Sequence, residues 1–147
     1  HLIEADNSSY LCSNRKDSTY IYMKNIAETY WKRKKMPIPH LLLSDYEGRN
    51  VWSHKGIVHW RGMNICMVTD GYWRNKSATN LLDIDYMYLC KGYKGEIAPL
   101  QKLFHIKRIV LDASLGDYKS KAYKEECKTL GLDYIDISEK GSFRILL

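Results

Sequence analysis

A run of four consecutive cations, Lys32-Arg33-Lys34-Lys35, follows the aromatic pair Tyr30-Trp31. Lysine and arginine side chains bind the phosphates of nucleic acids, and aromatic rings stack on unpaired bases. The same pattern is typical of an ordinary helix end, where cations complement the helix dipole and the rings belong to the core. The residues therefore indicate either a phosphate-contacting patch or a solvated helix end.

A second stretch that could bind an anion is Lys91-Gly92-Tyr93-Lys94-Gly95, between a predicted strand and a predicted helix. Backbone amides at the start of a helix can hold an anion. The stretch lacks the Gly-Lys-Ser/Thr ending of a phosphate loop, so a tight turn is the alternative. Lys91 and Lys94 are the second set of candidate DNA contacts, after Lys32, Arg33, Lys34 and Lys35.

The histidines and carboxylates lack the close spacing that metal centres use. The histidines considered are His40, His54, His59 and His105. Five carboxylates lie near predicted strand ends: Asp45, Glu47, Asp70, Asp112 and Asp117. They would either form a magnesium site or belong to solvated turns. No serine or cysteine nucleophile motif is present. We expect no catalytic residue, metal or other cofactor, and no small-molecule substrate. The enzymatic alternative is a metal-dependent nuclease or phosphodiesterase with an atypical site.

The cysteines show no paired spacing, which argues against a structural zinc site. They are Cys12, Cys66, Cys90 and Cys127. The last three lie within apolar patterns, which favours buried free thiols. The sequence leaves disulfide formation open.

These residues must be positioned by strands and helices that the hydrophobic pattern predicts. In the first half, Leu2–Ala5 and Tyr10–Cys12 indicate a β-hairpin. Apolar residues at helical spacing predict a helix that ends at Pro37 and Pro39; they are Met23, Ile26, Ala27, Tyr30 and Trp31. Further strands are predicted at His40–Ser44, Ile57–Trp60 and Met63–Thr69.

The second half has a clearer alternation of elements. We expect strands at Asp85–Cys90, Arg108–Ala113, Asp133–Ile137 and Phe143–Leu147, the last two joined by a turn at Ser138–Gly141. A short helix should carry Ile97, Leu100 and Phe104, and a longer one Tyr123, Cys127 and Leu130 before a Gly131 cap. This order predicts an α/β (α+β) fold, a mixed sheet with helices on its outer faces.

Composition agrees with one folded domain. The 147 residues are 45% hydrophobic, with a net charge of +6 and a pI near 9.1. A surplus of positive charge of this size is compatible with binding to nucleic acid or to an anionic membrane surface. No apolar run approaches the roughly 20 residues that span a bilayer. Because the chain opens directly in a strand-like stretch, we expect it to be part of a larger protein.

The stretch from Asp85 to Leu147 resembles the end of the metallo-β-lactamase-like domain that closes competence DNA-channel proteins of the ComEC type. The strand Tyr86–Cys90 leads into Tyr93-Lys94-Gly95-Glu96 where that family has paired histidines. Ile109-Val110-Leu111 then precedes Ser114–Tyr118, without the family's His-Pro, and Ser138–Gly141 matches its closing turn.

The upstream likeness follows the same order. Leu42–Gly48 stands at the family's His-x-His-x-Asp-His motif, and Met67–Gly71 at its metal-bridging aspartate. The phrases Ala27–Lys34 and Leu130–Ser138 resemble a Bacteroidetes-type branch. The resemblance implies a single degenerate domain over residues 1–147, with a mixed-sheet sandwich fold. Its vestigial metal positions would be Asp45, Asp70, Tyr93 and Lys94.

The resemblance also implies a cellular context. The domain would lie outside the cytoplasm, in the periplasm, as part of an inner-membrane protein and beside the channel portion of its own chain. Because every histidine of the family's metal site is replaced, we expect a metal-free, non-catalytic domain that contacts single- or double-stranded DNA or braces the channel. The remaining alternative is a protein-interaction module that ignores DNA and docks through aromatic residues such as Trp52, Trp60, Tyr72 and Trp73.

Overall fold

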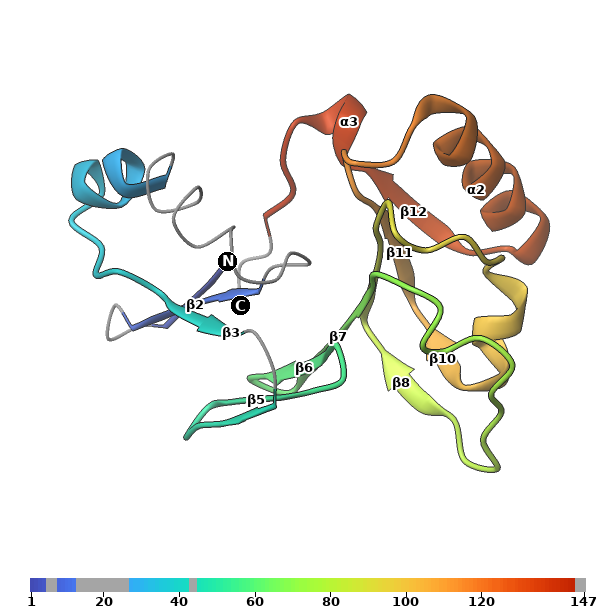
Figure 1. Cartoon of the computed structure of the whole chain (residues 1–147), viewed down its shortest axis with the longest axis horizontal. Helices are drawn as coiled ribbons and strands as arrows, with labels where there is room; N and C mark the ends of the chain where they lie inside the picture. The colour runs from blue at the N-terminus through green and yellow to red at the C-terminus, as the bar shows by residue number, and fades with distance from the viewer. Residues whose placement is uncertain (5–7, 13–26, 43–44, 145–147) are drawn as a thin grey trace.

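The structure is a computed structural model that describes residues 1–4, 8–12, 27–42 and 45–144 (Figure 1). Its centre is a seven-stranded sheet with the strand order β12-β11-β9-β7-β6-β5-β4. The strands are β4 (Tyr46–Glu47), β5 (Val51–His54), β6 (Ile57–Trp60), β7 (Met63–Val68), β9 (Tyr86–Leu89), β11 (Arg108–Leu111) and β12 (Asp133–Asp136). Strands β4 to β7 pair antiparallel, whereas β7, β9, β11 and β12 are parallel to one another.

Helices cover one face of the parallel half. Helix α2 (Asp117–Leu130) turns Tyr123 and Cys127, four residues apart, onto the sheet, and Gly131 ends the helix with a φ of 67°. The short 3₁₀ helix η1 (Ala98–Lys102) adds Leu100 to the same core. Alternate strand residues complete this core and are fully buried: Cys66, Val68, Met87, Leu89, Ile109 and Leu111.

A smaller sheet covers the opposite face of the antiparallel half. It has the order β1-β2-β3, with β1 (Leu2–Ile3), β2 (Ser9–Cys12) and β3 (His40–Leu42). Leu2 and Leu42 pack against Val58, Trp60 and Met63 in a second core cluster. Figure 1 shows β2 and β3 on the other side of β7 from α2. The two packed sheets give the α+β sandwich that the sequence predicted.

A pair of short strands and a short helix lie outside these two sheets. Strands β8 (Leu82–Ile84) and β10 (Phe104–Ile106) form a separate parallel pair. Helix α3 (Ile137–Lys140) follows β12, with Asp136 as its N-cap.

The predicted hairpin, the strand Ile57–Trp60 and the helix that Gly131 caps are confirmed. The prediction that Phe104 lies on the short helix is wrong. Helix η1 ends at Lys102, and Phe104 begins strand β10, which pairs with β8. The predicted turn Ser138–Gly141 is instead mostly helix α3, since the Asp136 side chain accepts the Ser138 N–H and caps a helical turn.

The remaining points concern the ends of predicted strands and helices. Residues 143 and 144 form no strand, and 145–147 lie outside the described residues. The predicted helix is described over 27–33, so Met23 and Ile26 also lie outside. The same applies to Leu43 and Ser44, at the end of the predicted third strand.

Candidate nucleic-acid interface

Several strands end along one edge of the seven-stranded sheet. The register aligns Val68 with Leu89, Leu89 with Leu111, and Leu111 with Asp136. The β5–β6 turn lies at the same edge, because the Met67 N–H donates to the Gly56 carbonyl. We call the residues beyond these strand ends (45, 54–56, 69–76, 90–95 and 112–116) the carboxyl edge. Ligands of open α/β sheets bind outside the carboxyl ends of strands, so this edge is the first place to look for a site.

The register brings Asp45 and Asp70, the two aspartates that the resemblance assigned to former metal positions, to the carboxyl edge. Asp45 lies 2.8 Å from His54 Nδ1, and its other oxygen accepts the Lys55 N–H at 3.4 Å. Asp70 accepts the N–H of Tyr72 at 2.8 Å within its own turn. Both carboxylates therefore bind groups of the nearest turn. Among the described residues, no three histidine, cysteine, aspartate or glutamate side chains gather as a metal-binding group.

The loop after β9 holds its lysines outward on a fixed backbone. Gly92 passes so close to Thr69 that a Cβ there would lie 1.9 Å from the Thr69 carbonyl oxygen. The Tyr93 ring is buried, and its hydroxyl donates to the Glu96 carbonyl at 2.6 Å. Lys91 and Lys94, by contrast, are exposed. Of the four positions predicted to be vestigial metal positions, Lys94 thus offers a cation, and Tyr93 belongs to the core.

The amides at the start of η1 already have an anionic partner within the chain. Glu126 on α2 accepts the N–H groups of Ile97 and Ala98 at 2.7 and 2.9 Å. Because one carboxylate oxygen takes both donors, these amides are not available to an external anion. The exposed side chains of Lys91 and Lys94 are therefore the cationic groups of this loop that a phosphate could contact.

An exposed ring with two cations lies beside this loop at the carboxyl edge. We call Lys55, Tyr72, Trp73 and Lys76 the Tyr72 cluster. Lys76 Nζ lies 3.3 Å from the centroid of the Tyr72 ring, and Lys55 Nζ lies 5.6 Å away. Hydrogen bonds from the side chains of Lys55 and Lys76 lower the pKa of Tyr72. Tyr72 remains 40% exposed, so the cluster combines a partly accessible aromatic ring with positive charge.

Trp73 anchors the Tyr72 cluster to the protein. Its ring meets Tyr72 edge-on at 4.8 Å and Phe104 of the core at 5.1 Å. Sequence reasoning named Tyr72 and Trp73 only as docking aromatics and missed Lys55 and Lys76. The sheet register alone joins Lys55, in the β5–β6 turn, to the segment after β7. Lys76, in contrast, is only four residues after Tyr72 in the sequence, a local proximity that could have marked it.

The four-cation run lies elsewhere on the molecule. It spans the end of the helix at 27–33, with Lys32 and Arg33 in the last turn and Lys34 and Lys35 in the turn that follows. Figure 1 shows that helix on the opposite side of β7 from the loop after β9. Trp31 is 4% exposed and belongs to the core, whereas Tyr30 is 45% exposed. Lys32 pairs with Glu28 at 2.8 Å, and Lys35 turns the chain with a φ of 53°. The structure therefore does not join these cations and those at the carboxyl edge into one surface.

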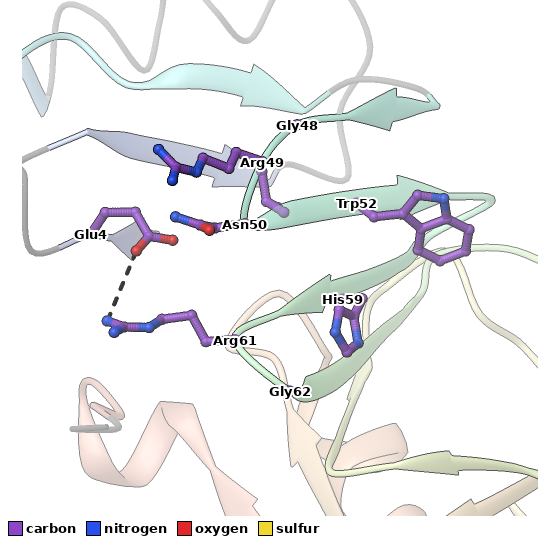
Figure 2. Close-up of a pocket in the computed structure, with 9 residues that line it drawn as sticks. Glu4, Gly48, Arg49, Asn50, Trp52, His59, Arg61 and Gly62 are labelled. Carbon is purple, nitrogen blue, oxygen red and sulfur yellow. Dashed lines mark ion pairs between the residues drawn. The ribbon is translucent and has the colours of Figure 1, made fainter.

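A hollow of about 420 Å³ opens at the other end of the antiparallel strands (Figure 2). Its lining comes from the β4–β5 turn, the β6–β7 turn, the middle of β5 and β6, and Glu4. Trp52 on its rim is 42% exposed, whereas Trp60, another predicted docking residue, is buried.

The described cysteines are free, and those predicted to be buried are buried. Burial raises the pKa of Cys66 to about 12 and that of Cys127 to about 11, so both stay protonated thiols at neutral pH. They belong to the core around α2 and β7, and neither contributes a nucleophile or a metal ligand to the carboxyl edge.

Comparison with known proteins gives one match. The family model of the ComEC C-terminal domain matches residues 1–147, the whole chain. No curated protein and no solved structure matches the chain. Within the described part, none of the helices has the length and apolar character needed to cross a membrane.

Proposed function

The chain belongs to the ComEC C-terminal domain family, and from this premise we propose that it is a non-catalytic domain that contacts DNA at a competence channel. Family membership indicates a role in competence DNA uptake and the context of a membrane protein. The proposal adds that residues 1–147 are one domain of a larger protein. It adds further that the domain lies outside the cytoplasm, beside the channel portion of the same chain.

The observation that carries the proposal is the Tyr72 cluster. Proteins that bind single strands combine cations along the backbone with aromatic rings on which bases stack, at about 1–3 kcal/mol per base. Tyr72 supplies the ring, and Lys55 and Lys76 supply two cations within 5.6 Å of its centroid. When a base approaches, the flexible lysine stems let both ammonium groups turn from the ring toward phosphates.

Additional phosphate contacts are assigned to the exposed lysines predicted from sequence. Lys91 and Lys94 share the carboxyl edge with the Tyr72 cluster and extend its positive surface. The run at 32–35 is a separate contact on the far side of β7. A strand that engages both would have to pass around the sheet, so we assign the first contact to the carboxyl edge.

The chemistry of the vestigial positions supports a binding role over hydrolysis. Asp45 is paired with His54, and Asp70 accepts a backbone amide of its own turn. Lys94 brings positive charge to the edge, where a divalent cation would be repelled. In this proposal, positive charge for phosphate binding replaces the metal ions that the resemblance would place here.

Fluorescence anisotropy with labelled single- and double-stranded oligonucleotides across a salt series tests the proposal. We expect binding that weakens linearly with the logarithm of salt concentration. The double variant Lys55→Ala, Lys76→Ala should reduce the single-strand slope by about 1.4, since each lost phosphate contact removes about 0.7.

The matched control is Lys121→Ala, Lys128→Ala, which removes the same charge from exposed positions of α2. Equal slopes for the two double variants, or no binding at low salt, would overturn the proposal. The same mixtures should contain intact oligonucleotide with and without EDTA. Cleavage that EDTA abolishes would instead support the nuclease alternative.

A further inference from the structure

The hollow in Figure 2 gathers opposite charges around one buried carboxylate. Glu4 is 7% exposed, and its Oε1 accepts the indole N–H of Trp60 at 2.5 Å. Its Oε2 is 3.8 Å from the guanidinium of Arg61, a long ion pair. Arg49 reaches toward Glu4 from the other side of the hollow. Two guanidiniums and one carboxylate leave a net charge of +1, which favours an anionic ligand.

The arginines can adapt to such a ligand. Arg61 occupies the β6–β7 turn, with 45% of its side chain exposed and a φ of 50°, and Arg49 is exposed in the β4–β5 turn. Glu4 is held from within by Trp60, so the outer guanidinium groups can move toward an incoming phosphate while the carboxylate stays in place. Planar guanidiniums bind phosphate oxygens in pairs, which makes arginine the preferred residue for this role.

The other end of the hollow is aromatic. Trp52 and His59 face each other across β5 and β6, and both line the hollow. His59 Nδ1 lies 2.7 Å from the Asn64 side-chain oxygen, which fixes the imidazole ring. The Trp52 indole is 42% exposed, so one of its faces can receive a flat ring. Asn50 lies at the cationic end, beside Arg49 and Glu4, and offers both a donor and an acceptor.

We propose that this hollow binds a nucleoside phosphate, with the phosphate between Arg49 and Arg61 and the base against Trp52. The volume of about 420 Å³ is within the range of small-molecule sites. The inference goes beyond the proposed DNA contact, because the two arginines of the hollow lie at the opposite ends of β5 and β6 from the carboxyl edge. Trp52 lies between the two sites, with its ring 6.1 Å from the ring of His54. The ligand has two sources, a free nucleotide or the phosphorylated end of a DNA strand.

Isothermal titration with thymidine 5′-monophosphate, thymidine and inorganic phosphate tests the site. We expect the nucleotide to bind at least tenfold more tightly than thymidine. Arg49→Gln and Arg61→Gln should each weaken nucleotide binding about tenfold, since loss of one charged contact is worth about 1.4 kcal/mol. Trp52→Ala should weaken the binding of the nucleotide but not the binding of inorganic phosphate.

Arg74→Gln is the control, since Arg74 is exposed and outside the hollow. Equal affinity of the Arg49 and Arg74 variants, equal binding of nucleotide and thymidine, or no binding at millimolar nucleotide would overturn the inference. Arg49→Gln keeps the test valid if Arg61→Gln, which leaves Glu4 without its cation, does not fold.

Two further arms separate this site from the DNA surface and identify the ligand's source. The double variant Lys55→Ala, Lys76→Ala should bind the nucleotide normally; its loss of nucleotide binding would contradict a separate hollow. A 5′-phosphorylated oligonucleotide that displaces the nucleotide, where its 5′-hydroxyl counterpart does not, supports the site and identifies a strand end. If neither oligonucleotide displaces the bound nucleotide, the result supports the site and identifies a free nucleotide as its ligand.

Discussion

Replacing Asp136 with asparagine tests how α2 and β12 support the carboxyl edge. Asp136 is 3% exposed at the end of β12. Its carboxylate lies 2.6 Å from Lys124 Nζ and accepts the Ser120 hydroxyl at 2.9 Å, both on α2. It also accepts the Ser138 N–H at 2.8 Å and so caps α3. The charge of one side chain therefore connects the sheet to both helices.

The expected loss of folding stability in the Asp136→Asn variant follows from this geometry. Removing one partner of a buried ion pair costs about 3–5 kcal/mol. Lys124 is 19% exposed and keeps Glu139 at 2.6 Å, so the lower end applies, about 3 kcal/mol. At about 2–4 °C per kcal/mol for a chain near this size, Tm should fall by about 6–12 °C.

Circular dichroism during thermal and urea denaturation measures the effect. The control is Asp133→Asn, because Asp133 is 76% exposed and 3.4 Å from Arg108, a pair expected to contribute under 1 kcal/mol. Equal Tm values for the two variants would refute the assignment of the Asp136 contacts as a main support of α2. The Asp136 variant should still bind DNA at temperatures where it is folded.

The contribution of Asp136 to folding stability depends on pH in a definite direction. Burial alone would raise the pKa of Asp136, but hydrogen bonds from Lys124, Ser138 and Ser120 outweigh it and hold the pKa below its usual range. A carboxyl group with a lowered folded pKa stabilises the fold above its unfolded pKa of about 3.9. That stability is lost as pH falls through the folded pKa. The stability difference between the wild type and the asparagine variant should be constant from pH 5 to 7 and shrink below about pH 4.

Three other predictions test the carboxyl edge and the core beside it. Gly92→Ala should destabilise the fold by about 1–3 kcal/mol in urea, because the new methyl group would overlap the Thr69 carbonyl oxygen; an unchanged midpoint would contradict this contact. Lys76→Met should raise the pKa of Tyr72, measured by NMR of ring-labelled tyrosine, since the lysine favours the phenolate; an unchanged pKa would refute the cluster. Cys66 should resist alkylation until the protein unfolds, because its buried thiol has a raised pKa of about 12; rapid modification of the native protein would contradict its burial.

Local patterns predict those elements whose signals are local. The spacing of Tyr123, Cys127 and Leu130, followed by Gly131, defines α2 and its end without any tertiary information. Phe104 shows the limit of this reasoning, because the same apolar spacing fits a helix face and a short helix followed by a strand. The choice depends on β8, a three-residue strand whose own pattern is too short to predict.

The candidate surfaces depend on pairings that the sequence does not reveal. Lys55 and Tyr72 come together because β6 and β7 pair antiparallel, and no motif spans them. Glu4 and Arg61 lie 57 positions apart and meet where the small sheet covers the large one. Exposure of the lysines in the four-cation run was predictable from composition, but the separation of this run from the loop after β9 was not.

Photocrosslinking is the most direct test of DNA contact at the carboxyl edge. A single-stranded oligonucleotide carrying 5-iododeoxyuridine is irradiated with the full chain, and the adduct is located by mass spectrometry. Because aromatic side chains that stack on the halogenated base crosslink preferentially, we predict an adduct at Tyr72 that high salt and Tyr72→Leu both abolish. Bound DNA that yields adducts only outside the Tyr72 cluster would contradict the account.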